Sequence, residues 1–97
     1  MNDTKVLEVL RTYRTHFVAM RVEPKDYPHD ELVGPRQGED VLAHCCGMLP
    51  KIELFIHEGK IGKAKRWLGF IQGCLWTSGI YTLTNLMNHN RPDEPEP

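Results

Sequence analysis

The stretch that decides the fold of this 97-residue chain is Lys63-Ala-Lys-Arg-Trp-Leu-Gly-Phe-Ile-Gln-Gly-Cys-Leu-Trp-Thr-Ser-Gly79. After Arg66 no charged side chain occurs until Arg91, although 26% of all residues are charged. On a helix of about 3.6 residues per turn, one face of this stretch is mainly apolar, and Gly79 follows as a natural left-handed stop. That face comprises Ala64, Trp67, Leu68, Ile71, Cys74, Leu75 and Ser78. We therefore expect a deeply embedded helix.

The opposite face of the same stretch is unusual for a helix surface. Gly69, Gly73 and Thr77 form a strip of small residues at four-residue spacing, flanked by Phe70 and Trp76. Each glycine in a helix interior costs about 1 kcal/mol relative to alanine, so close approach of another backbone is the expected reason for them. We therefore predict that these five residues form an interface, either inside the chain or between subunits. A homodimer is the favoured partner, because two-fold dimers are the commonest oligomers.

The remaining pattern predicts an all-α, four-helix bundle-like domain. Apolar residues recur at spacings of three and four, typical of amphipathic helices, and place helices near 4–22, 39–58, 62–78 and 82–89. The short turn between the second and third helices makes them antiparallel neighbours. A long irregular connection fills 23–38, where three prolines prevent regular helix.

Two details of this layout are specific expectations. Pro50 lies inside the apolar pattern of the second helix and should kink or split it, because proline lacks an N–H and clashes with the preceding turn. In the connection, Tyr27, Leu32 and Val33 are the apolar residues expected to hold it against the core.

Length and charge limit the function classes. Residues 1–92 suffice for one domain, and the acidic, proline-rich residues 93–97 should be disordered. A net charge of −1 gives no overall attraction to nucleic acid, so nucleic-acid binding is unlikely. Polar residues interrupt the apolar run after Trp67, which argues against a membrane span. Three cysteines form no disulfide framework, and no long apolar run follows Met1, so we expect the cytoplasm.

Two short motifs suggest chemistry only superficially. His44-Cys45-Cys46 could ligate a metal with Cys74, His57 or His89 as remote partners, but structural zinc sites usually show two closely spaced ligand pairs, and buried structural cysteines are the simpler interpretation. Gly59-Lys-Ile-Gly-Lys63 lacks the glycine spacing and the Ser or Thr of a phosphate loop. No nucleophile–base pattern is visible, so we predict no catalytic residue, no metal and no cofactor, and hence no enzyme.

A basic cluster marks the start of the third helix. It consists of Lys60, Lys63, Lys65 and Arg66. The free N–H groups of a helix N-terminus beside such cations could hold an anion. A solvated basic face that balances Glu53 and Glu58 is the interpretation we favour, with the cluster mostly exposed.

The run from Gly62 to Trp76, with Gly79, Tyr81-Thr-Leu83 and His89-Asn-Arg-Pro92, resembles a set of small uncharacterised proteins encoded by phages and prophages. Those proteins have a similar Lys-Ala-x-Arg-Trp-Leu-Gly-Phe-x-Gln-Gly core. The likeness covers the C-terminal half of the chain, from about His44. It implies a phage or prophage origin and therefore a bacterial host cell, and it implies no activity or functional residue.

Two functions stay open on this basis. The first is a small non-catalytic protein that binds a host or phage protein as a homo-oligomer, and the two-faced central helix and the lack of a catalytic pattern favour it. The alternative is a helical protein that binds a small anionic ligand, such as a nucleotide, through the Lys60–Arg66 cluster.

Overall fold

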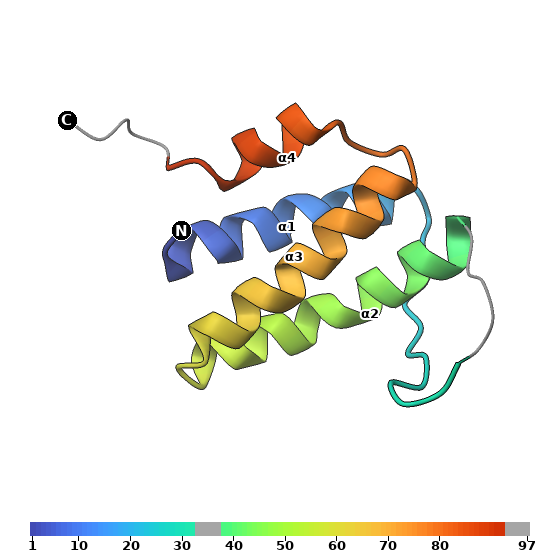
Figure 1. Ribbon diagram of the computed structural model, residues 1–97, viewed down its shortest axis with the longest axis horizontal. Coiled ribbons are helices and arrows are strands. Elements are labelled where there is room, and N and C mark those ends of the chain that lie inside the picture. The colour runs from blue at the N-terminus through green and yellow to red at the C-terminus, as the bar shows by residue number, and fades with distance from the viewer. Residues whose placement is uncertain (33–37, 93–97) are drawn as a thin grey trace.

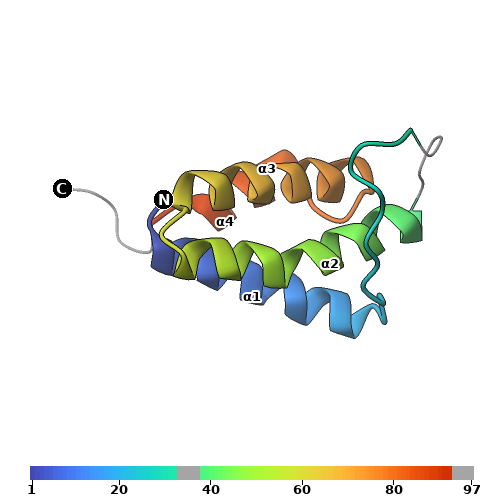
Figure 2. The same cartoon turned by 90° about the horizontal axis from the view of Figure 1, so that it is seen from below.

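The computed structural model describes residues 1–32 and 38–92 of the chain. These residues form four helices and no strand: α1 (Asp3–Ala19), α2 (Gly38–His57), α3 (Ile61–Thr77) and α4 (Leu83–Asn90). Helices α2 and α3 pack as antiparallel neighbours, α1 lies alongside them, and the short α4 lies along α1 (Figures 1 and 2). The predicted all-α, bundle-like fold is therefore confirmed. The predictions for 33–37 and for the tail at 93–97 lie outside the described residues.

The hydrophobic core is built from one face of each helix. The predicted inner face of α3 is confirmed, because Ala64, Leu68, Ile71 and Leu75 are almost completely buried. Trp67 and Cys74 lie at the edges of that face and are partly buried. The other helices contribute apolar residues at helical spacing. The members from α1, α2 and α4 are Val6, Val9, Leu10, Tyr13, Phe17, Leu42, Cys45, Met48, Leu49, Ile52, Ile56 and Leu86.

Three of the helices end with the same kind of C-terminal cap. A residue in the left-handed region follows each helix, and the next N–H bonds back to a carbonyl five residues earlier. Gly59 (φ 77°) and Gly79 (φ 74°) fill this position after α2 and α3, as expected for glycine. After α1 the position is taken by Arg21 (φ 59°). For this reason α1 ends at Ala19, three residues before the predicted end.

Pro50 does not split the second helix. Helix α2 is continuous over 20 residues, with Pro50 in its interior, so the predicted alternative of two separate helices is wrong. Figure 2 shows α2 bending near its middle, which agrees with the predicted kink. A proline inside a helix removes one hydrogen bond and displaces the preceding turn without necessarily ending the helix.

The connection between α1 and α2 lies directly against α2. The Lys25 N–H donates a 2.9 Å hydrogen bond to the Ala43 carbonyl. Gly47 permits this contact, because a Cβ at that position would overlap the backbone carbonyl of Lys25. Tyr27 is partly buried beside His44, as predicted for an anchoring residue. Leu32 was predicted to anchor the connection as well, and this is wrong, since its side chain is fully exposed (104%).

Polar side chains join helix α4 to the other helices, in addition to the buried Leu86. The Gln72 and Asn90 amides donate to each other across the gap between α3 and α4, at 2.7 and 3.1 Å. The buried Tyr13 hydroxyl accepts from Gln72 (3.1 Å) and bonds to His89 (2.9 Å). Burial raises the pKa of Tyr13 to about 12, so the hydroxyl stays neutral. This network fixes the position of α4 on the core.

Within the described ranges, every helix is either too short or too polar to cross a membrane.

Candidate functional site

We call Gly69, Phe70, Gly73, Trp76 and Thr77 the outer face of α3. All five residues are exposed, and the two aromatic side chains retain about half of their accessible surface, 54% for Phe70 and 50% for Trp76. A Cβ added to Gly69 or Gly73 would meet no atom of the described residues within 4 Å. No described element of the chain therefore covers the two glycines, whereas Phe70 lies beside His44 of α2. The subunit alternative stays a prediction.

The outer face of α3 is uncharged and has few polar groups that need a partner. The Thr77 hydroxyl donates back to the carbonyls of its own helix, at 3.1 Å from Gly73 and 3.1 Å from Cys74. Arg66, two turns before Gly73, marks the N-terminal end of the face. The surface thus combines a flat centre with an aromatic ring on each side, and a contiguous apolar surface of this kind is typical of an interaction site.

The basic cluster is exposed, as predicted, but its members do not converge. Lys60 pairs with Glu58 at 3.4 Å. The Lys63 ammonium lies over the Phe55 ring, 4.5 Å from its centroid. Lys63 and Arg66, three residues apart, are neighbours on one side of α3, whereas Lys65 lies about 160° around the helix from Lys63, so the three cations of α3 do not share one side. The arrangement does not form one enclosed anion site from all four residues.

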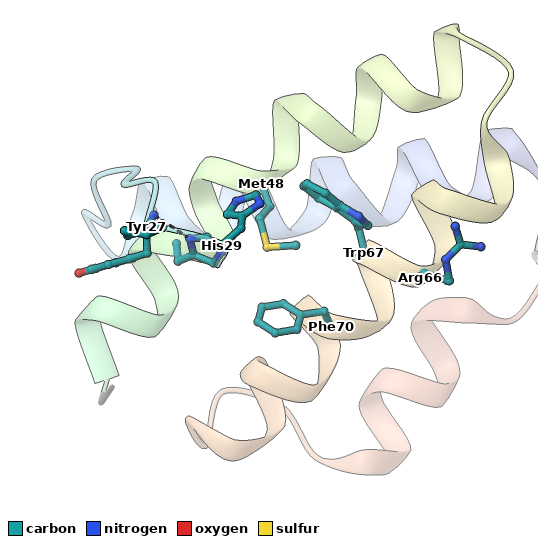
Figure 3. A pocket seen from close by; sticks show the side chains of 8 residues that line it. Tyr27, His29, Met48, Arg66, Trp67 and Phe70 are labelled. Carbon is teal, nitrogen blue, oxygen red and sulfur yellow. Dashed lines mark hydrogen bonds between the residues drawn. The ribbon is translucent and has the colours of Figure 1, made fainter. Parts of the chain in front are cut away.

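A pocket adjoins the outer face on the side of α2. It has a volume of about 450 Å³, and it lies between the connection, α2 and α3. Figure 3 shows His29, Met48, Trp67 and Phe70 gathered around the same space, with Tyr27 at one end and Arg66 at the other. The complete lining is Tyr27, Pro28, His29, His44, Met48, Arg66, Trp67 and Phe70.

Two walls of the pocket are fixed from behind. The Trp67 ring packs edge-to-face on Phe55, with centroids 4.8 Å apart at 85°. The His44 ring accepts a hydrogen bond at Nδ1 from the Tyr27 N–H (3.3 Å), which leaves Nε2 to carry the proton. Tyr27 in turn donates from its hydroxyl to Asp40 at 2.8 Å. These contacts give the aromatic walls defined orientations before anything binds.

The pocket is electrostatically uneven along its length. At the connection end, His29 lies 3.5 Å from Asp26, and Asp26 also pairs with Lys51 at 3.0 Å. Hydrogen bonding to Lys51 lowers the pKa of Asp26, so this carboxylate is ionised. Burial lowers the pKa of His44, which favours its neutral form at pH 7. At the other end Arg66 makes no ion pair with the described residues.

The His44-Cys45-Cys46 run points in three directions. His44 faces the pocket, Cys45 is buried in the core beside Cys74, and the Cys46 sulfur lies 4.0 Å from the Val22 carbonyl. A hydrogen bond to Cys74 and burial raise the pKa of Cys45, so this thiol is protonated. Among the described residues, no three His, Cys, Asp or Glu side chains are grouped closely enough to hold a metal ion.

Sequence reasoning missed the pocket, although it named several of its residues for other reasons. Arg66 was assigned to the basic cluster and Phe70 to the interface, while the partners from the connection and from α2 lie at least 18 residues away in sequence. The one local hint is the aromatic and histidine content of the connection, at Tyr27 and His29. Comparison with protein-family models, curated proteins and solved structures finds no match to this chain. The resemblance to phage and prophage proteins therefore stays a prediction.

Proposed function

We propose that this protein is a non-catalytic binding protein that self-associates through the outer face of α3. The observation that carries the proposal is the open space over Gly69 and Gly73, between two half-exposed aromatic side chains. The occupant that we assign to this face is a second copy of the chain. The resulting dimer would then be the form that presents its remaining surface to a host or phage protein.

The two glycines destabilise α3 unless another helix packs against them. Two glycines in the interior of α3 together cost about 2 kcal/mol relative to alanines, and no contact in the described chain offsets this. A neighbouring helix can approach a glycine strip more closely than any other helix surface, because helix separation depends on the side chains at the contact. Close packing of a second helix is therefore the interaction that would explain both glycines at once.

A second copy of the chain would be complementary to this face. In a two-fold dimer the same patch lies on both sides, so a flat strip meets a flat strip and each aromatic flank lies beside the other copy's glycines. The five residues carry no charge, so pairing two copies buries no like charges. If the axis passes near Gly73 in an antiparallel crossing, the two Arg66 residues lie at opposite ends, each about 10 Å from the axis.

The test is the oligomeric state, measured by sedimentation equilibrium from 5 to 200 µM. We expect the parent protein to be a dimer in the upper part of this range. Gly73→Leu should make it monomeric, because the larger side chain separates the two helices. Trp76→Lys should have the same effect by placing a charge in the interface, and it leaves the core intact because Trp76 is half-exposed.

Leu54→Lys is the matched control. Leu54 is a similarly exposed apolar residue (56%) on α2, outside the outer face of α3, so its replacement should leave the dimer unchanged. A parent protein that is monomeric at 200 µM contradicts the proposal. A dimer that resists both Gly73→Leu and Trp76→Lys contradicts the assignment to this face.

A further inference from the structure

We infer that the pocket between the connection, α2 and α3 binds a planar aromatic carboxylate, with its ring between the pocket's aromatic walls and its carboxylate at Arg66. This site adjoins the proposed dimer interface and shares one residue with it. Of its lining residues, only Phe70 also belongs to the outer face of α3. The shape of the pocket, the geometry of its walls and the distribution of charge along it support this assignment.

The size and walls of the pocket suit a flat apolar ring. Its volume of about 450 Å³ lies within the usual range for small-molecule sites, about 300–1,000 Å³. The surrounding rings meet one another at steep angles: His29 and Trp67 at 68°, and His44 and Phe70 at 82°, with centroids about 6 Å apart. In an edge-to-face pair the ring that contributes its edge keeps both of its faces free of its partner, so part of the aromatic surface stays available for a ligand. Met48 adds a polarisable thioether to this wall.

Charge then sets the orientation of the ligand. At the connection end the Lys51 cation is already paired with Asp26 at 3.0 Å, and the Tyr27 hydroxyl already donates to Asp40. Arg66 lies at the opposite end, beyond Trp67 (Figure 3). A guanidinium presents two parallel N–H groups that match a carboxylate in a bidentate pair. A single guanidinium balances the one charge of a carboxylate, whereas a phosphate monoester carries a charge of about −1.5 to −2 at pH 7.

The site is also partly ordered before binding. Trp67 is held by Phe55 from behind, and the Lys63 ammonium lies 5.9 Å from the centroid of the Trp67 ring. The backbone that leads to His29 is tied to α2 by the Lys25–Ala43 hydrogen bond, and the His29 ring lies edge-to-face with Trp67. A ligand therefore meets walls that need little rearrangement, which lowers the entropic cost of binding.

Two matched probes test the inference: 2-naphthoate, and 2-naphthamide, which has the same shape without the charge. Binding is followed by NMR titration of the full chain, using the Trp67 indole N–H and the Met48 methyl group as reporters. We expect 2-naphthoate to bind at least tenfold more tightly than 2-naphthamide, with the largest shifts at these two groups. Arg66→Gln should remove most of that difference and leave the affinity for 2-naphthamide unchanged.

Lys65→Gln is the matched charge control, because it removes a neighbouring exposed cation that does not line the pocket. It should leave the affinity for both probes unchanged. Phe70→Ala should weaken both probes about equally by removing one aromatic wall.

Several results would overturn the inference. They are the absence of binding at 10 mM 2-naphthoate, equal affinities for the two probes, or equal effects of Arg66→Gln and Lys65→Gln. The monomeric variant Trp76→Lys separates this site from the dimer interface, since it does not touch the pocket lining. Retained 2-naphthoate binding in Trp76→Lys supports the pocket, whereas loss of binding assigns the ligand to the subunit interface instead.

Discussion

Two helices of this protein carry glycine in their interiors, and the two places have opposite surroundings. In α2, the backbone of Lys25 lies so close to Gly47 that a Cβ there would overlap it. In α3, a Cβ at Gly69 or Gly73 would meet no described atom within 4 Å. The same residue type, in the same secondary structure, therefore marks a filled contact in one helix and an open surface in the other.

A glycine in the interior of a helix therefore indicates less than the identity of its neighbour. Glycine destabilises the interior of a helix but leaves room where a side chain would be, so it predicts that another segment or molecule approaches the helix closely. It does not identify what approaches. For Gly47 the neighbour is the connection of the same chain, and for Gly69 and Gly73 the described chain provides no neighbour.

The largest effect should come from Gly47→Ala. The added methyl group meets backbone, which cannot move aside like the end of a side chain, so the connection must shift. Overpacking outweighs the gain in helix propensity, and we expect a net loss of about 2 kcal/mol in the free energy of unfolding. Urea denaturation followed by circular dichroism measures it. A Gly47→Ala protein as stable as the parent would show that the connection does not need this contact.

The opposite sign is expected for Gly73→Ala. In the monomeric Trp76→Lys background the new methyl group points into open space, so only helix propensity changes, and stability should rise by about 1 kcal/mol. The same urea experiment measures this change, and the Trp76→Lys protein is the reference. A loss of stability in that background would mean that the chain itself covers Gly73.

The smallest effect is the pH dependence of stability that comes from His44, on the side of α2 that faces the connection. Burial lowers the pKa of His44 in the folded protein below the value of about 6.5 expected for an unfolded chain. The neutral ring is therefore favoured by folding, so its contribution to stability is complete above pH 6.5 and decreases as the pH falls towards the folded-state pKa. Protonation at Nδ1 also removes the hydrogen bond from the Tyr27 N–H.

We accordingly expect a lower urea midpoint at pH 5.0 than at pH 7.5. His44→Gln should reduce that difference, and His89→Gln should reduce it separately, because burial also lowers the pKa of His89. An identical midpoint at both pH values in the parent protein would contradict this assignment. An unchanged pH dependence in His44→Gln would remove the link to the connection.

Local features of the fold could be predicted from the sequence. The four helices, the inner face of α3 and the stops at Gly59 and Gly79 follow from apolar spacing and from the backbone freedom of glycine. The end of α1 was placed three residues too late, because Arg21 adopts the left-handed conformation that usually identifies glycine. A local rule failed there because the residue at the decisive position was not the usual one.

The contacts that build the candidate sites could not be predicted, because they join residues far apart in the chain. Gly47 meets Lys25, Phe70 meets His44, and Gln72 meets Asn90. Each of these residues has an ordinary local role that sequence analysis can name, such as helix interior, helix surface or helix end. Their pairing depends on how the helices pack, and apolar periodicity fixes which face is buried but not which side chains meet at its edges.

The two tryptophans give the molecule separate optical reporters. Trp67 forms a wall of the pocket and packs against Phe55, whereas half of the Trp76 side chain is exposed on the outer face of α3. The two indoles therefore fluoresce from different environments, because Trp67 is partly buried and Trp76 is exposed to water. Trp67→Phe leaves an emission that responds to whatever covers the outer face, and Trp76→Phe leaves one that responds to the contents of the pocket. A single chain can thus be observed at either surface without an attached dye.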